Sequence, residues 1–342
     1  MSEGKLNVED TGELTAWLRR TGLIQPDEQP RIRVLTGGVS NRTVLVQRTG
    51  TCHDTWVIKQ ALKKLRVQAD WFSDPIRVHR EAAGLQCLQQ LTPARSVPGF
   101  VFEDYEHHLL IMQAVPQPHE NWKSELMAGR IEPDYCHQFG TLLGTIHRHS
   151  FERCDEIRPQ FDDRTFFESL RLEPYYSYAA TQAPDAAAFL RGLLSDTRER
   201  CLTLVHGDYS PKNILVHEGR IVLLDHEVIH WGDPAFDVGF GLTHLLSKAH
   251  HLFGHRHSFA CAARTVWQSY HAEIHDAPWH SELERFVVRH TLGCLAARVA
   301  GRSPLEYLSE SQRTIQYRVT VELMNNIPDT VEALIDNFVE RV

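Results

Sequence analysis

The chain has 342 residues, of which 42% are hydrophobic and 23% are charged, and its formal net charge at pH 7 is -8. These proportions are typical of a globular protein with a sizeable core, and the length allows two lobes of about 150 residues each. The acidic balance argues against a nucleic-acid binder, whose surface is usually basic. No run of about 18 apolar residues occurs, so we expect no membrane span.

The seven cysteines are scattered along the chain and never form a C-x-x-C pair. Such usage is typical of reduced thiols, and it does not indicate a disulfide framework or a zinc site. The first ten residues are polar and acidic, without the apolar segment of a secretory leader. From these features we expect a cytoplasmic protein.

The first third of the chain predicts a small antiparallel sheet. Leu14, Trp17 and Leu18 have the spacing of an amphipathic helix that opens the chain over 10–21. After it, short apolar or alternating runs separated by turn-forming residues indicate strands with tight connections, and one helical pattern interrupts them. The expected strands cover 31–35, 43–47, 55–59, 100–102 and 109–112, and the expected helix covers 75–90.

The remainder of the chain predicts mainly helices. Pro116 and Pro118 interrupt regular structure and indicate a hinge. Asp134 is the expected N-cap of an amphipathic helix over 134–149. Short strands are expected at 202–205, 214–216 and 221–224, and further helices at 185–198, 234–249, 258–274, 281–300, 309–325 and 329–340.

These elements define an α+β fold class with two regions of different character. A lobe with a five-stranded antiparallel sheet is expected over 1–112, including the opening helix. A hinge follows over 113–118, and a mainly α-helical lobe with a small β element covers 119–342.

Polar residues beside two apolar runs form the densest candidate site. Asp208 follows the expected strand 202–205, Asn213 comes five positions later, and Asp225 directly follows the run 221–224. Phosphoryl transfer to an alcohol needs a carboxylate that accepts or orients the hydroxyl proton, and hard oxygen ligands that hold Mg²⁺ on the nucleotide phosphates. We therefore interpret Asp208 as the catalytic base, and Asn213 and Asp225 as the Mg²⁺ ligands.

The order His206-x-Asp208-x₄-Asn213 followed by Asp225 resembles the catalytic loop and metal-binding aspartate of protein-kinase-like enzymes. The form His206-Gly-Asp208 and the stretch G-D-P-A-F-D ending at Asp237 are more similar to the aminoglycoside phosphotransferase and choline kinase superfamily. The resemblance implies a bilobal protein-kinase-like fold, ATP and Mg²⁺ as cofactors, and a small-molecule acceptor: a sugar, an amino alcohol or an aminoglycoside. It also implies that His206 is structural and that Asp237 braces the catalytic loop.

The N-terminal region supplies residues for a nucleotide site of that kind. The turn 37–41 lies between the first two strands, where backbone N–H groups and Ser40 can approach phosphate. Lys59 ends the third strand and Glu81 lies on the following helix, the positions of the lysine–glutamate pair in kinases. The expected nucleotide-binding residues are Gly38, Ser40, Asn41, Lys59, Glu81, Gln113 and Val115.

Some details are similar to the methylthioribose kinase-like branch of the superfamily. These are I-K-Q-A-L over 58–62, L-E-P-Y over 172–175, and Arg298. In that branch an arginine at the corresponding place helps to hold the substrate, although this chain has Ala297 where a second arginine is expected. Arg298 and Glu227 are therefore the candidate substrate residues, with Glu227 equally interpretable as a surface charge.

Other functions match parts of this pattern. A catalytically silent nucleotide-binding module is one alternative, against which the complete set of kinase residues argues. A metal-dependent hydrolase is another, and it would leave Lys59 and Glu81 without roles. The separate histidine cluster within 244–257 predicts a solvated face rather than a metal site. The hydrolase would use His206, Asp208, Asp225, His226 and His230.

Overall fold

The computed structural model describes residues 6–36, 40–49, 54–66 and 72–342. The chain divides into two compact units. The first unit contains Met1–Gln90, Val97–Pro118 and the short segment Asp225–Glu227, and the second contains Leu91–Ser96, His119–Leu224 and Val228–Val342. The segment Asp225–Glu227 thus belongs with a part of the chain that is far away in sequence.

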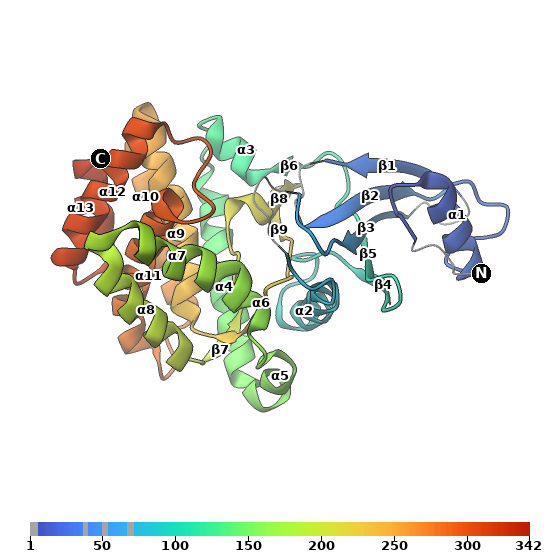
Figure 1. The fold of residues 1–342 in the computed structure, drawn as a ribbon, viewed down its shortest axis with the longest axis horizontal. Helices are drawn as coiled ribbons and strands as arrows, with labels where there is room; N and C mark the ends of the chain where they lie inside the picture. The colour runs from blue at the N-terminus through green and yellow to red at the C-terminus, as the bar shows by residue number, and fades with distance from the viewer. Residues whose placement is uncertain (1–5, 37–39, 50–53, 67–71) are drawn as a thin grey trace. The chain divides into compact units, whose positions relative to one another are not determined.

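Five antiparallel strands form the sheet of the first unit, in the order β1-β2-β3-β5-β4 (Figure 1). Apolar residues at alternate positions of two central strands are buried, namely Val44 and Val46 in β2 and Trp56 and Ile58 in β3. Such alternation is typical of a sheet with one covered face. The elements are β1 (Arg31–Leu35), β2 (Asn41–Gln47), β3 (Thr55–Ala61), α2 (Arg77–Leu91), β4 (Phe100–Asp104) and β5 (Leu109–Gln113).

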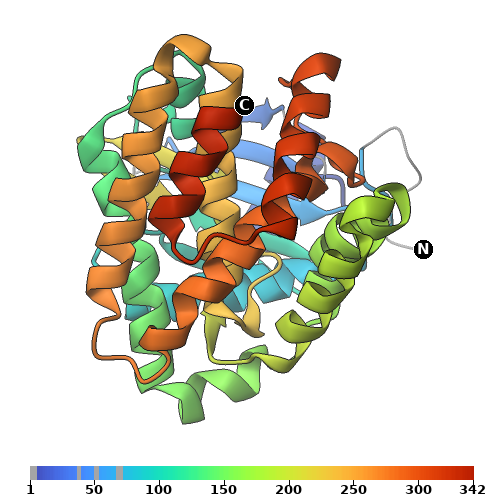
Figure 2. The ribbon, with the colours of Figure 1, turned by 90° about the vertical axis from the view of Figure 1, so that its left-hand side faces the viewer.

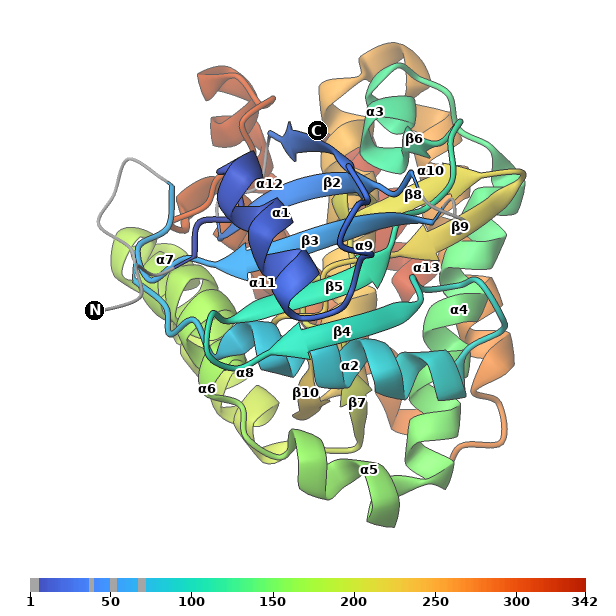
Figure 3. The same ribbon diagram turned by 90° about the vertical axis from the view of Figure 1, so that its right-hand side faces the viewer.

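The helix α1 (Thr11–Arg20) covers one face of this sheet (Figure 3). Leu14, Trp17 and Leu18 bury its apolar side in the same core as the strand residues. The side chain of Asp10 caps the helix by accepting hydrogen bonds from two backbone N–H groups of the first turn. The predicted opening helix and five-stranded antiparallel sheet are therefore confirmed.

The second unit surrounds α9 (Pro234–His251), which is buried on nearly all sides. A helix that is apolar all round belongs in a core, and α10 (Arg256–Glu273) and α11 (His280–Ala300) pack against it (Figure 2). The Asp233 side chain caps the start of α9, where Pro234 follows at a position that needs no N–H donor. These three helices form the centre of the unit.

Two small sheets complete the second unit, in the orders β6-β8-β9 and β10-β7. In the hairpin of β8 and β9, Ile214 pairs with Leu223, so Asn213 and Leu224 lie together just beyond its end. The N–H of Leu224 donates to the carbonyl of Asn213 over 2.9 Å. The strands are β6 (Glu120–Asn121), β7 (Thr203–Val205), β8 (Ile214–His217), β9 (Arg220–Leu223) and β10 (His230–Gly232).

The remaining helical segments of the second unit lie around this centre. The α-helices are α3 (Trp122–Met127), α4 (Pro133–Glu152), α5 (Cys154–Phe161), α6 (Thr165–Phe167), α7 (Tyr178–Gln182), α8 (Ala187–Glu199), α12 (Glu310–Asn325) and α13 (Val331–Arg341). The other segments are the π-helix η1 (Glu168–Ser177) and the 3₁₀ turns η2 (Pro184–Ala186), η3 (Pro211–Asn213) and η4 (Phe253–His255).

Some local predictions are wrong. The helix expected over 134–149 begins at Pro133, so Asp134 lies inside its first turn and is not the N-cap. Proline favours the first helical position because that position needs no N–H donor. His244 and His250 are buried, so the histidine cluster is not a solvated face at these two residues, because α9 is enclosed by its neighbours.

The described residues contain neither a membrane-spanning helix nor a metal-binding cluster. No helix among them combines the length and the apolar character that a membrane span requires. Within the same residues, no group of three or more histidine, cysteine, aspartate or glutamate side chains is arranged to hold a metal ion.

Candidate active site

Three charged side chains meet in the first unit. The Nζ of Lys59 in β3 lies 2.5 Å from Oε1 of Glu81 on α2, and 3.0 Å from Oδ1 of Asp225. Burial acts to lower the pKa of Lys59, but the charges of Asp225 and Glu81 outweigh it and hold this pKa above its ordinary value. Lys59 is therefore a cation that two carboxylates fix in place.

Asp225 has an unusual backbone conformation. Its φ angle is 68°, in the left-handed region that residues other than glycine seldom adopt. Aspartate tolerates this region better than most residues because its short polar side chain can form local hydrogen bonds. Strained residues persist where surrounding contacts hold them, and they are common at functional sites. The ion pair with Lys59 is one such contact.

Arg77, at the start of α2, was not singled out from the sequence. Its side chain is completely buried and its Nε lies 3.1 Å from Oε2 of Glu227. Its other nitrogens donate to the carbonyls of Ser40, Leu62 and Asp74, among others. Arg77 thus ties the residue before β2 and the residue after β3 to Glu227. Glu227 is consequently buried and paired, so its interpretation as a surface charge is wrong.

The sequence does contain a signal for Arg77. It lies four residues before Glu81, so the two side chains share one face of α2. A basic residue one turn before a functional glutamate can reach the same region. The signal is weak because charged pairs at this spacing usually lie on solvated helix faces.

The other expected nucleotide residues occupy different positions in the first unit. Gly38 lies outside the described residues. Asn41, buried at the start of β2, donates from Nδ2 to Oγ of Ser40 over 3.2 Å. Gln113 is exposed at the end of β5, and Val115 is half-buried just beyond it. Their nucleotide contacts stay a prediction.

In the second unit, Asp237 holds the start of the loop that follows β7. Its carboxylate accepts the backbone N–H of His206 over 2.6 Å and that of Gly207 over 2.8 Å. Burial acts to raise the pKa of Asp237, but the hydrogen bond and charge of His147 and the charge of His206 reverse this, so the pKa is lowered. The structure thus gives Asp237 the bracing position that the resemblance implied.

Gly207 is required by the geometry of this turn. Its φ is +77°, and a Cβ there would lie 3.0 Å from a methyl group of Val228 and 3.1 Å from the carbonyl of the same residue. A side chain would therefore be strained and crowded. This glycine lets the chain turn from the end of β7 to Asp208.

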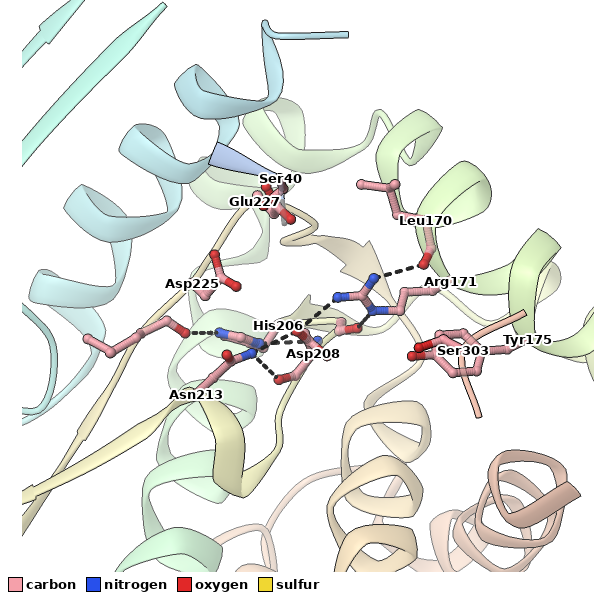
Figure 4. Close-up of polar contacts among 12 residues, drawn as sticks. Ser40, Leu170, Arg171, Tyr175, His206, Asp208, Asn213, Asp225, Glu227 and Ser303 are labelled. Atoms are coloured by element: carbon pink, nitrogen blue, oxygen red, sulfur yellow. Dashed lines mark hydrogen bonds and ion pairs between the residues drawn. The ribbon is translucent and has the colours of Figure 1, made fainter. Parts of the chain in front are cut away.

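Asp208 is held by two neighbours in the second unit (Figure 4). The Nδ2 of Asn213 donates to Oδ2 of Asp208 over 2.7 Å and to its carbonyl over 3.0 Å. The Nη2 of Arg171, on η1, lies 2.9 Å from the same Oδ2, and its Nε donates to the Gly207 carbonyl over 2.9 Å. The orientation of the Asp208 carboxylate is therefore fixed before any ligand binds.

Arg171 is a second residue that sequence reasoning missed. It lies in the segment over 168–177, for which no helix or strand was predicted and which contains Pro174, a residue that usually interrupts a helix. The chain instead continues as a π-helix, a rare form that is frequently found at functional sites. No pattern in the sequence indicated that this arginine would face Asp208.

The ring nitrogens of His206 are used by the backbone. Its Nδ1 accepts the N–H of Asp208 over 3.2 Å, and its Nε2 lies 3.1 Å from the carbonyl of Leu224. His230 likewise places Nδ1 2.9 Å from the carbonyl of Val228. His206 therefore has no ring nitrogen left to bind a metal, which weakens the hydrolase alternative.

Arg298 lies near the end of α11, away from any described carboxylate partner. Its Nη1 donates to the hydroxyl of Tyr175 over 3.0 Å and to the carbonyl of Ser303 over 2.6 Å. Its guanidinium carbon lies 5.5 Å from the Tyr175 ring centroid and 6.0 Å from that of Phe240. Arg298, the expected substrate residue, is thus only partly exposed, and neutral groups hold its side chain in place.

Comparisons with known proteins agree with this arrangement. The profile of the phosphotransferase enzyme family matches residues 31–265. A methylthioribose kinase of Pectobacterium carotovorum is 27% identical over 256 residues, which are 64% of this chain and 62% of that protein. The chain therefore spans less than two thirds of the length of this relative.

Solved structures with a similar fold cover nearly the whole chain. The macrolide 2'-phosphotransferase MphH of Brachybacterium faecium has a TM-score of 0.53 and 18% identity, covering 92% of this chain and 98% of its own. The amicoumacin kinase hAmiN, in complex with AMP-PNP, Ca²⁺ and Ami, has a TM-score of 0.56 and 16% identity, with 96% and 98% covered. The predicted protein-kinase-like fold is confirmed.

Proposed function

The chain belongs to the phosphotransferase enzyme family, and on that premise we propose that it transfers the γ-phosphate of ATP to a hydroxyl group of a small molecule. The observation that carries the proposal is the fixed carboxylate of Asp208, held by Asn213 and by a loop that Asp237 clamps. A carboxylate placed in this way can accept the proton of an alcohol. We propose Asp208 as the base.

The residues of the first unit support a nucleotide site. Lys59 is a permanent cation of the kind that pairs with nucleotide phosphates, and Glu81 fixes it. Ser40 and Asn41 would contact the phosphates, and Gln113 and Val115 would contact the rest of the nucleotide. Because ATP is a cytoplasmic metabolite, we keep the cytoplasm as the expected location.

The proposed metal ligands fit Mg²⁺ by their chemistry. Both are hard oxygen donors, as Mg²⁺ prefers. The Nδ2 of Asn213 is occupied by Asp208, which leaves Oδ1 of the amide as its ligand atom. Asp225 would supply the carboxylate. When bound, Mg²⁺ would neutralise charge on the β- and γ-phosphates.

The acceptor class rests on the family and its relatives. The curated relative is named for methylthioribose, a solved neighbour for a macrolide and another for amicoumacin. We propose a hydroxylated small molecule of the sugar, amino alcohol or aminoglycoside type for this chain. Arg298 and Glu227 remain the proposed substrate residues, with Glu227 acting through its pair with Arg77.

Binding of the nonhydrolysable nucleotide AMP-PNP tests the proposal without a known acceptor. We expect the wild-type chain to bind it in a Mg²⁺-dependent manner by titration calorimetry. Asp225→Ala should weaken this binding by about 100-fold or more, because it removes a charged ligand of the metal. Asp208→Ala should change it by less than about threefold, because a base contributes to the transition state. Mg²⁺-independent binding, or equal losses in both variants, would contradict the assignment.

A further inference from the structure

A lysine is buried inside the second unit without a carboxylate partner. Lys248 on α9 has no exposed surface, and its Nζ donates to the carbonyl of His244 over 3.1 Å. Among the described residues, the ring of Tyr307 also lies near the ammonium, with its centroid 5.4 Å away. Among the described residues no carboxylate lies within ion-pair distance of it. An ammonium buried in this way is costly unless something binds it.

Other polar atoms around Lys248 are also buried and have no described partner. They are Nε2 of His244, the hydroxyl oxygen of Tyr307 and Nε of Arg298. Native proteins leave few buried polar atoms unsatisfied, and a group of them usually marks a bound water, ion or ligand. Burial, followed by the charges of Arg298 and Lys248, lowers the pKa of His244 far below its ordinary value. His244 is therefore neutral, with one ring nitrogen free to contact a ligand.

The charge around this cluster is positive. Lys123 pairs with Glu306, so these two charges cancel. Arg298 contacts only the neutral oxygens of Tyr175 and Ser303. Burial and the charges of Lys123 and Arg298 lower the pKa of Lys248 to about 7, with Glu306 opposing. Among the described residues neither Lys248 nor Arg298 forms an ion pair, and Glu306 acts on both only from a greater distance.

The cluster begins next to the catalytic loop. A Cβ on Gly241 of α9 would lie 3.5 Å from the carbonyl of Tyr209, so α9 packs directly on this loop. Phe240, His244 and Lys248 follow each other at four-residue intervals on one face of α9. Each interval covers about 6 Å, so Lys248 lies roughly 12 Å along the helix from Phe240.

A second line of contacts joins the same cluster to Asp208. Arg171 pairs with Asp208, and Tyr175 lies four residues later on η1 (Figure 4). The Tyr175 ring packs at 5.8 Å from that of Phe240, and its hydroxyl accepts the hydrogen bond from Arg298. Contacts within the second unit therefore connect Asp208, through Arg171 and Tyr175, to Arg298.

We infer that the acceptor is an anionic hydroxylated molecule whose phosphate or carboxylate group is bound by Lys248, His244 and Tyr307, with Arg298 beside them. The inference rests on the proposed function. In the reaction, the acceptor oxygen forms a bond to the γ-phosphorus while the bond to the β–γ bridging oxygen breaks. The hydroxyl proton passes to Asp208, and ADP leaves. An acceptor with an amine at this place would add a third positive charge, so the amino alcohol and aminoglycoside classes are disfavoured.

Anion binding tests this inference on the full chain. Inorganic phosphate would be titrated in the presence of saturating Mg²⁺ and AMP-PNP, which occupy the nucleotide site. We expect Lys248→Met to weaken phosphate binding by at least tenfold, and Tyr307→Phe by a smaller factor. Arg285→Met, which removes an exposed positive charge from α11, is the matched control and should leave the affinity unchanged. Equal affinities in Lys248→Met and Arg285→Met would overturn the inference.

An acceptor panel separates this inference from the proposed function. Ribose 5-phosphate, gluconate, ribose and choline would be compared in an ATP-consumption assay, with wild-type chain and Lys248→Met. We expect turnover with an anionic member and a rise of its KM by tenfold or more in Lys248→Met. Ribose 5-phosphate and gluconate distinguish an acceptor that carries a phosphate group from one that carries a carboxylate group. Turnover with ribose or choline that is unaffected by Lys248→Met would overturn the inference and leave the proposed function intact. Lys248-dependent phosphate binding without any ATP consumption would instead count against the proposed function.

Discussion

Two buried lysines, Lys59 in the first unit and Lys248 in the second, differ in how their charge is compensated. In the first unit, Lys59 is fixed by Glu81 and Asp225, and Arg77 is fixed by Glu227 and several carbonyls. In the second unit, Lys248 has no described carboxylate partner. The first arrangement is complete within the chain, whereas the second needs an anion from outside. A buried charge that the fold does not compensate indicates the charge of the ligand that the fold binds.

The largest expected loss of stability follows from removal of Arg77, whose charge is compensated within the first unit. Arg77→Met would remove the ion pair of the buried Glu227 and several hydrogen bonds to carbonyls. We expect a loss of about 3–5 kcal/mol in the free energy of unfolding, measured by urea denaturation. Arg66→Met is the control, because Arg66 is half-exposed in its pair with Glu9 and should cost less than about 1 kcal/mol. Similar losses in both variants would contradict the proposed role of Arg77.

A smaller loss of stability is expected for Asp237, which holds the proposed catalytic loop in the second unit. Asp237→Asn would replace a charged acceptor of two backbone N–H groups by a neutral amide, at a cost of about 2–3 kcal/mol at pH 7. The pKa of Asp237 is lowered, so its contribution is fully present at neutral pH and is lost as the pH falls below the ordinary aspartate range. Denaturation between pH 2 and 7 should show a weaker acid dependence in the variant. Parallel profiles would contradict this account.

Lys248 should behave in the opposite way to Arg77. Lys248→Met removes an uncompensated buried charge and should raise the free energy of unfolding of the ligand-free chain by about 1–2 kcal/mol at pH 7. The pKa of Lys248 is lowered to about 7, so the destabilisation by this lysine is fully present below pH 7 and decreases at higher pH. The difference between variant and wild type should shrink as the pH rises from 7 toward 10.5. A destabilised variant would show that an internal partner already compensates Lys248.

The smallest effect is expected for the exposed pair beside this cluster. Lys123 pairs with Glu306, whose side chain is 67% exposed, so Glu306→Gln should change the free energy of unfolding by less than about 0.5 kcal/mol. The same change removes the one negative charge that opposes the pKa decrease of Lys248. At pH 5, well below the lowered pKa, Lys248 stays charged in the variant, so loss of the negative charge of Glu306 should increase phosphate affinity slightly. A decrease would contradict an anion bound beside Glu306.

Much of the fold could be predicted because strong local patterns decide it. Burial follows from apolar residues at alternate strand positions, such as Val44 and Val46. It follows equally from the helical spacing of Leu14, Trp17 and Leu18. The family resemblance, drawn from the motif around Asp208, is also confirmed. The segment with Pro174 was not predicted because proline usually ends regular structure, whereas here a π-helix continues through it.

The contacts of the candidate site were less predictable than its motif residues. The ion pairs of Asp208 with Arg171 and of Glu227 with Arg77 join positions far apart in sequence, and no periodicity reports such pairs. The sequence also did not predict the burial of Lys248, because lysine ordinarily lies on a solvated face. Only the packing of other helices around α9 shows that this lysine is enclosed.

Transfer of labelled phosphate from Mg²⁺-ATP to an acceptor from the panel tests the central claim most directly. The single-turnover rate of the wild-type chain would be compared with that of Asp208→Ala, after AMP-PNP affinity has been shown to be equal in both. We predict a decrease of about 10³-fold in the variant, because the base acts on the transferred proton in the transition state. An Asp208→Ala chain that transfers phosphate at the wild-type rate would contradict the assignment of Asp208 as the base.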